Sequence, residues 1–217
     1  MITRFILFLS LLLILDSFNI LAQGCAVQIP NYKDNYTRFV KQLESGNTDI
    51  DFSEFRNSFL QSKQYSLKHR QYDSLKQEVY NGIKNKNYES IVCITKAMIS
   101  IDYTSMFAHK YLQQTYKIVG DSVNMRKYHD IEFGLLHSIL DSGDGQSCST
   151  GWHVTQIEEE YFILSMLGVQ LQMQSINSSD NNMCDKMVVK TEDGETINYY
   201  FEANKVFAKE KELFEGK

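Results

Sequence analysis

Apolar residues recur every three or four positions through the first two thirds of the chain, which is the spacing of helices that bury one face. The first such segment covers residues 32–43 and is followed by a Ser-Gly-Asn turn. A second segment begins at Asp51 and carries Phe52, Phe55 and Phe59 on one face. Aromatic residues at this spacing are typical of a buried core. We therefore predict that the two segments form a first helical hairpin.

The next four predicted helices contain an internal near-repeat. It aligns one set of apolar positions with a second set thirty-three residues later: Leu75, Val79 and Ile83 with Ala108, Leu112 and Tyr116. The turns at 86–87 and 120–121 are thirty-four residues apart. Helix–turn–helix units of this period resemble tetratricopeptide repeats, although Tyr103 stands at the corner between repeats where proline is usual. Generic helical hairpins are the alternative interpretation.

Beyond residue 140 the apolar spacing changes from helical to alternating. Short runs at 152–155, 169–174 and 187–189 predict strands. Asp193-Gly194 predicts a tight hairpin turn before a last strand at 197–201. These strands are expected to form a small sheet with one buried face.

One helix is predicted between the first two of these strands, over 156–167. Thr155 and Glu158 have the spacing of a capping box, and Gly168 follows where the helix would end. The acidic run 158–160 would then lie in the first helical turn, where carboxylates favour the positive end of the helix dipole. We interpret this run as stabilising the helix and not as a catalytic carboxylate pair.

Together these patterns predict an α+β fold. Tetratricopeptide-like helical hairpins are expected over 31–140, followed over 141–203 by a small β-α-β-β-β module with an antiparallel sheet. A charged tail covers 204–217.

The N-terminal segment has the layout of an export signal. Arg4 precedes the apolar run 5–15, which is too short to span a bilayer. Ala22 lies where a signal peptidase would cut, so residues 1–22 are predicted to be the signal peptide of a periplasmic or secreted protein. Cleavage before Cys25 with lipidation of that cysteine is the alternative. It would give an envelope lipoprotein, and membrane contact is expected only in that case.

Composition narrows the classes of function. The 217 residues include 22 Lys and Arg against 27 Asp and Glu, a net charge of −5 that argues against a nucleic-acid partner. The four cysteines show no Cys-x-x-Cys spacing, so the common zinc and redox motifs are absent. Four cysteines allow three complete pairings. Among the candidate bonds, Cys148–Cys184 would lie within the sheet module.

Stacked hairpins of this period expose the first helix of each pair along a shared groove. The polar residues expected to point into that groove are Gln77, Asn81, Lys84, Lys110, Gln114 and Lys117. Three lysines in an acidic chain suit an acidic ligand or a C-terminal carboxylate, so a protein or peptide partner is expected. The alternative is that these lysines are ordinary solvated residues.

The loop over 141–147 is rich in residues that turn the chain or bind ions. Its residues of interest are Asp141, Asp144 and Ser147. Aligned with a calcium-binding EF-hand loop, it places Leu140 at the first ligand position and Gly151 at the last, so that motif fails. We interpret the loop as a helix stop followed by a turn. If it acts with a histidine instead, the chain would be an uncharacterised hydrolase.

The sequence offers no recognisable site for a metal or a cofactor. His129 and His137 are eight residues apart, twice the interval that places two imidazoles on adjacent helical turns. No phosphate-binding loop, dinucleotide-binding glycine motif or nucleophile elbow is present. We therefore predict no cofactor, no metal and no catalytic residue.

Three sequence segments carry a family resemblance. They are Asp51–Phe59 with Ser62–Tyr65, Ser142–Ser147, and Glu159–Tyr161. With the helical repeat, they resemble the domain of unknown function 4919 family of secreted bacterial proteins over roughly residues 48–205. The resemblance implies helical hairpins followed by a small sheet, and an exported location, but no activity. The expected function is a non-catalytic binding or scaffolding module of the bacterial cell envelope, and the hydrolase is the alternative.

Overall fold

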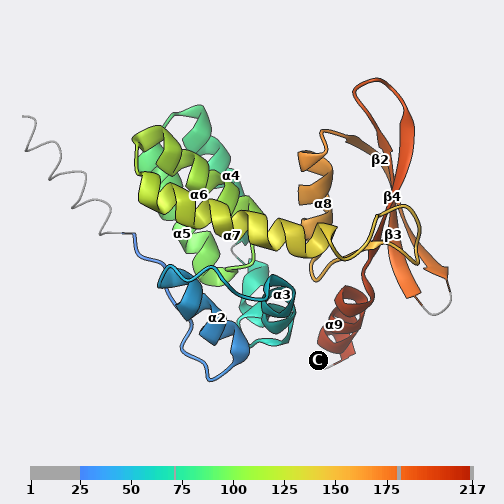
Figure 1. Cartoon of the computed structure of the whole chain (residues 1–217), viewed down its shortest axis with the longest axis horizontal. Coiled ribbons are helices and arrows are strands. Elements are labelled where there is room, and N and C mark those ends of the chain that lie inside the picture. The colour runs from blue at the N-terminus through green and yellow to red at the C-terminus, as the bar shows by residue number, and fades with distance from the viewer. Residues whose placement is uncertain (1–24, 71, 180–181, 216–217) are drawn as a thin grey trace, which may run out of the picture.

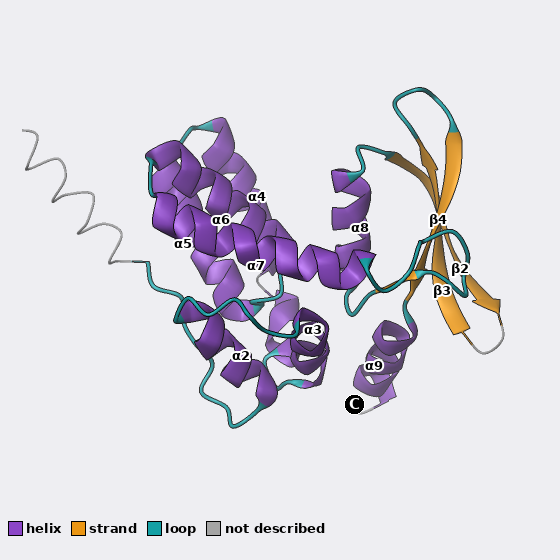
Figure 2. Cartoon of the chain, viewed as in Figure 1, coloured by secondary structure: helices purple, strands orange, loops and turns teal. Residues whose placement is uncertain are grey.

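The computed structural model describes residues 25–70, 72–179 and 182–215. Helices make up the first part of the chain, and a small sheet dominates the second (Figures 1 and 2). This arrangement confirms the α+β class. The predicted signal peptide, 1–22, lies outside the described residues. Within those residues, no helix combines the length and the apolar character needed to cross a membrane.

The helical part follows the chain order of its elements. They are α2 (Asn35–Glu44), α3 (Phe52–Gln61), the 3₁₀ helix η1 (Tyr65–Arg70), α4 (Tyr72–Lys84), α5 (Tyr88–Ile101), α6 (Met106–Val119) and α7 (Ser122–Leu140). The helices α4, α5 and α6 each pack on the helix that follows, and α3 packs on α7 (Figure 1). The hairpins are therefore present, whereas their tetratricopeptide character stays a prediction.

Short polar residues begin five of these helices. Each cap side chain accepts a hydrogen bond from the backbone N–H three residues further on, which satisfies a donor that the first helical turn leaves unpaired. These residues are Asp34, Asp51, Asn87, Ser105 and Asp121. At the other end of α6, Gly120 adopts the left-handed conformation with φ 82° and closes the helix.

Aromatic side chains join the first hairpin to the rest of the core. The rings of Tyr36 and Phe59 lie 4.9 Å apart, and Tyr36 also stacks on Phe55. The Tyr36 hydroxyl accepts a hydrogen bond from the backbone N–H of Tyr103 at 2.8 Å. All of these side chains are fully buried. The aromatic face predicted for 52–59 is therefore core.

The second part contains a four-stranded sheet among the described residues. Its elements are β1 (Trp152–His153), α8 (Ile157–Met166), β2 (Gln170–Ser179), β3 (Asn182–Lys190), β4 (Thr196–Glu202) and α9 (Asn204–Glu215). The strand order is β1-β4-β3-β2. Figure 1 shows α8 between the helical part and the sheet.

The sheet is mixed, and the prediction of a purely antiparallel sheet is wrong. The β2–β3 and β3–β4 pairs are antiparallel, but β1 pairs with β4 in parallel, with Trp152 opposite Phe201. No hairpin joins β1 to β4, because α8, β2 and β3 lie between them in the sequence, so the antiparallel direction is not imposed. The Trp152 ring packs 5.4 Å from that of Tyr199, which fixes this short strand.

The capping box predicted at the start of α8 is also wrong by one position. The helix begins at Ile157 after Gln156, so its third residue is Glu159 and not Glu158. The Glu159 carboxylate accepts hydrogen bonds from the backbone N–H of Thr155 at 2.7 Å and from its hydroxyl at 3.1 Å. Glu158 is thereby free to turn toward a different element.

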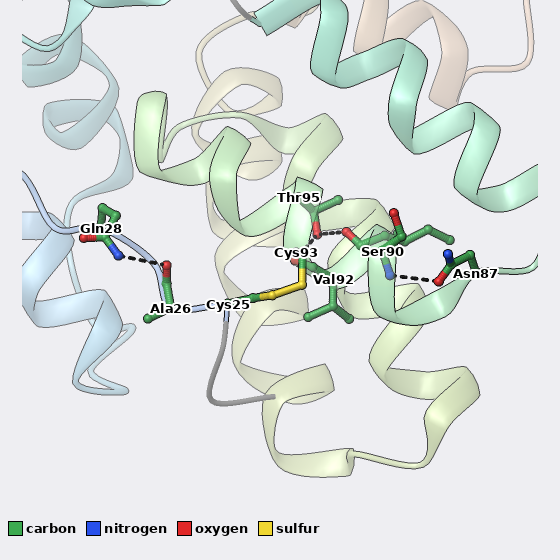
Figure 3. The surroundings of a disulfide bond; sticks show 9 residues. Cys25, Ala26, Gln28, Asn87, Ser90, Val92, Cys93 and Thr95 are labelled. Atoms are coloured by element: carbon green, nitrogen blue, oxygen red, sulfur yellow. Dashed lines mark hydrogen bonds between the residues drawn. A yellow bond between two sulfur atoms is a disulfide. The ribbon is translucent and has the colours of Figure 1, made fainter. Parts of the chain in front are cut away.

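Two disulfides pair the four cysteines. Cys148–Cys184 joins the loop before β1 to β3, a pairing that the sequence left among several. Cys25–Cys93 fastens the N-terminal segment to α5 (Figure 3). A hydrogen bond from the Gln28 N–H to the Ser100 hydroxyl at 2.8 Å holds the same segment further along α5.

Candidate functional site

A cleft of about 270 Å³ opens between α4, α6 and α8. The helical part supplies two of its walls, and α8 supplies the third. The side chains that determine its chemistry are Tyr72, Lys76 and Tyr80 from α4, Phe107, Lys110 and Tyr111 from α6, and Tyr161 and Phe162 from α8. The floor is formed by Lys68, Asp102, Gln156 and Glu158.

Helical spacing explains why these side chains converge. The α4 residues are four apart and the α6 residues three and four apart, so each set occupies one helix face. On the opposite face of α6, Ala108, Leu112 and Tyr116 are buried in the core. The face that remains is therefore the one that α4 and α8 enclose.

An aromatic cluster forms the wall between α4 and α6. The ring centroids of Phe107 and Tyr111 are 4.6 Å apart, and Tyr80 lies edge-on to both at 5.7 and 6.2 Å. Such rings offer flat apolar faces and edges that favour contact with another ring. Tyr80 is 46% exposed, so the cluster reaches the mouth of the cleft.

Two ammonium groups lie along the cleft without a carboxylate partner. Lys76 Nζ lies 5.3 Å from the ring centroid of Tyr72 and 5.7 Å from that of Phe107. Lys110 Nζ lies 5.4 Å from the Phe162 centroid and 3.3 Å from the sulfur of Met166. Among the described residues, neither makes an ion pair within 4.0 Å. Both are half-buried.

The floor of the cleft, in contrast, holds a cation that already has two carboxylate partners. Lys68 Nζ lies 3.1 Å from both the Asp102 and the Glu158 carboxylates, and it also contacts Gln156. Burial alone would lower the pKa of Lys68, but the two carboxylates outweigh it and raise that pKa above its usual range. The Lys68 ammonium at the floor of the cleft is therefore occupied by ion pairs within the protein.

Hydroxyl groups at the cleft also make hydrogen bonds within the protein. Tyr72 and Ser105 share a hydrogen bond, and Thr104 donates its hydroxyl to Asp102 at 2.6 Å. No histidine or cysteine is among the residues that line the cleft. The arrangement can hold a ligand by charge and by ring contact.

The groove predicted from the sequence coincides with this cleft at one residue. Lys110 lines it, whereas the other five, Gln77, Asn81, Lys84, Gln114 and Lys117, are exposed and lie outside its lining. On α4 the lining residues Lys76 and Tyr80 immediately precede Gln77 and Asn81, so the predicted face is rotated by one residue, about 100°. The cleft also needs α8, which the repeat pattern does not include.

The loop over 141–147 is satisfied within itself. Asp144 accepts hydrogen bonds from the Thr150 hydroxyl at 2.5 Å and the Gln146 N–H at 2.9 Å, and these bonds lower the pKa of its carboxyl. The Ser147 hydroxyl bonds to those of Ser149 and Thr150. The bonds of Asp144 and Ser147 are thus local to residues 144–150, and the role of the loop as a connector stays a prediction. Asp141 caps the end of α7.

The two histidines of α7, His129 and His137, flank an aromatic ring. The Phe133 ring lies between them, 4.4 Å from His129 and 6.2 Å from His137. Within the described part of the chain, no group of three or more His, Cys, Asp or Glu side chains is placed to hold an ion.

Sequence reasoning missed the roles of two consecutive carboxylates in α8. Glu159 forms a buried ion pair with Arg56 at 2.9 Å. Glu160 faces Asp185 of β3, and both are almost fully buried. Burial first, and then Asp185, raise the pKa of Glu160 to about 9, so this carboxyl keeps its proton at neutral pH. The run of acids was visible in the sequence, but Arg56 and Asp185 are distant in it.

The fold and the cleft define the class as an α+β protein with helical hairpins, a small sheet module and a cleft lined by α4, α6 and α8. The family described as domain of unknown function DUF4919 matches residues 25–212. The chain belongs to this family, as its resemblance in three sequence segments implied. No curated protein and no solved structure matches the chain.

Proposed function

We propose that the protein is an exported, non-catalytic binding module of the bacterial cell envelope whose ligand occupies the cleft between α4, α6 and α8. The observation that carries this proposal is the pair of half-buried, unpaired ammonium groups beside an aromatic wall. A half-buried cation without a partner loses solvation that a bound anion restores.

The two disulfides support the exported location. Disulfides persist in oxidising compartments and are rare in the cytosol, and both bonds here are internal. The Cys25–Cys93 bond also bears on how the chain is processed. Because the Cys25 thiol cannot carry a disulfide and a lipid together, we favour cleavage after Ala22 over the lipoprotein route. Mass spectrometry of the mature chain tests this: an N-terminal Gln23 with two disulfides supports secretion, and a fatty acid on Cys25 refutes it.

Binding in the cleft is tested with a library of tripeptides and ligand-observed NMR. Ser165 lines the cleft from an exposed position on α8, so Ser165→Trp fills the space without entering the core. Gln114→Trp places the same ring on an exposed face outside the cleft. Binding that is lost in Ser165→Trp and kept in Gln114→Trp supports the proposal. No binding by any member at millimolar concentration, or equal binding by both variants, overturns it.

A further inference from the structure

We propose that the cleft selects a ligand with a single carboxylate next to an aromatic ring, as at the C-terminus of a peptide or in a free aromatic acid. This inference rests on the proposed binding function and specifies the chemistry of its ligand. Three properties of the cleft carry it: its net charge, the placement of its rings and its volume.

The charges of the cleft leave room for one negative charge. The ionised groups at the cleft are three lysines and three carboxylates: Lys68, Lys76, Lys110, Asp102, Glu158 and Glu159. One of the carboxylates, Glu159, is already paired with Arg56 behind the cleft wall. Counting Arg56, four cations face three carboxylates, which leaves one positive charge. A monoanion neutralises this charge, whereas a phosphate dianion would exceed it by one negative charge.

The end of a helix adds to the positive field. Ser105 and Met106, at the N-terminus of α6, line the cleft. The first turn of α6 contains no acidic residue that would compensate its dipole. The positive end of that dipole therefore acts together with Lys76 and Lys110 on the same space.

The aromatic side chains near Lys76 determine which ligand group is favoured next to the carboxylate. Lys76 sits over Phe107, and Phe107 contacts Tyr111 and Tyr80. A carboxylate that approaches Lys76 therefore brings the atoms next to it against this aromatic wall. An aromatic group gains ring contacts there that a methyl group does not.

The volume limits the size of the group that enters. A volume of about 270 Å³ lies just below the usual range of small-molecule sites, which begins at about 300 Å³. It holds one terminal residue or a small acid, and it excludes a folded partner surface. Since charge and ring are shared by a peptide end and a free acid, the test has to separate those two sources.

The test uses calorimetric titration of the full mature chain with five probes. N-acetylphenylalanine carries charge and ring, its amide removes the charge, N-acetylalanine removes the ring, and phenyl phosphate changes the anion. Alanyl-alanyl-phenylalanine adds a peptide. We expect the amide and N-acetylalanine to bind at least about tenfold more weakly than N-acetylphenylalanine, which corresponds to about 1.4 kcal/mol. Tighter binding by the tripeptide assigns the peptide source, and equal binding assigns the free acid.

Lysine variants show whether the charge acts in the cleft. Lys76→Met with Lys110→Met should weaken N-acetylphenylalanine about tenfold or more, and Lys84→Met, on the exposed face of α4, should leave it unchanged. Equal affinity for acid and amide, tighter binding of phenyl phosphate, or an equal loss in Lys84→Met overturns the inference. In those cases the binding function still stands if Ser165→Trp abolishes binding. If no probe and no tripeptide binds, both are overturned.

Discussion

Arg56 should be the most sensitive polar position of the fold, because it joins the helical part to the sheet module. Its guanidinium is 2% exposed and donates to the Ser138 hydroxyl at 2.9 Å, to the His153 carbonyl at 3.2 Å and to the Glu159 carboxylate at 2.9 Å. Arg56→Met keeps most of the packing volume but leaves Glu159 without its cation. Breaking a buried ion pair from one side costs about 3–5 kcal/mol, a large fraction of a typical domain stability.

A double-mutant cycle, with urea unfolding followed by circular dichroism, measures the free energy that couples Arg56 to Glu159. Arg56→Met and Glu159→Gln should each cost about 3–5 kcal/mol, and the double variant should cost clearly less than their sum, with a coupling energy of about 1–3 kcal/mol. Arg38→Met is the matched control. Its ion pair with Glu54 spans 3.9 Å, and both side chains are about half exposed, so the loss should stay below about 1 kcal/mol.

Additive losses of stability in the two single variants would refute a coupling between Arg56 and Glu159. If the losses of stability in the two single variants simply add, Arg56 and Glu159 stabilise the fold independently. The ion pair between the two parts then contributes no coupling energy. A loss in Arg56→Met no larger than that of the Arg38 control would be equally damaging.

Four further predictions follow from single contacts. Burial and Asp185 raise the pKa of Glu160 from 4.5 to about 9, so the folded chain keeps a proton that the unfolded chain loses. Stability should fall as pH rises across that window, by at most about 1.4 kcal/mol per unit, and Glu160→Gln should flatten the slope in urea titrations at a series of pH values. Cys93→Ser opens a cross-link across 68 residues and should cost about 4 kcal/mol in non-reducing urea unfolding. Leu112→Ala, at a fully buried site, should cost about 2–5 kcal/mol on the same assay, with less than about 0.5 for the exposed Lys117→Ala. Asp144→Ala should leave the calorimetric affinity of the cleft unchanged; loss of binding there would restore the loop as a site.

Local patterns were sufficient for most of the helical part. Helix caps such as Asp51 and Ser105, and turns such as Gly120, are decided by groups three or four residues apart, so a sequence displays them directly. The sheet was harder. The direction of β1 depends on which strand it meets. Its partner β4 begins after forty-two intervening residues, 154–195, and no local rule encodes that pairing.

Most of the cleft residues could not be predicted from the sequence, for a related reason. Lys110 was identified as a ligand-facing residue, but its neighbours in space come from α4 and α8. A rotation of one residue separates the exposed Gln77 from the cleft residue Lys76, and an apolar stripe read from sequence does not fix a helix to that accuracy. The aromatic wall carries no signal distinct from that of a buried core, because Phe107 and Tyr111 have the same spacing as core residues.

The run of three acids in α8 explains how the cleft keeps its shape. Successive helical residues point about 100° apart, so Glu158, Glu159 and Glu160 face three directions. Glu158 meets Lys68 at the floor of the cleft, Glu159 meets Arg56 of α3, and Glu160 meets Asp185 of the sheet. The helix that forms the third wall is therefore fixed on two sides by ion pairs, and on the third side it buries a carboxyl against the sheet. Loss of any one contact should lower ligand affinity as well as stability, since the same contacts position both.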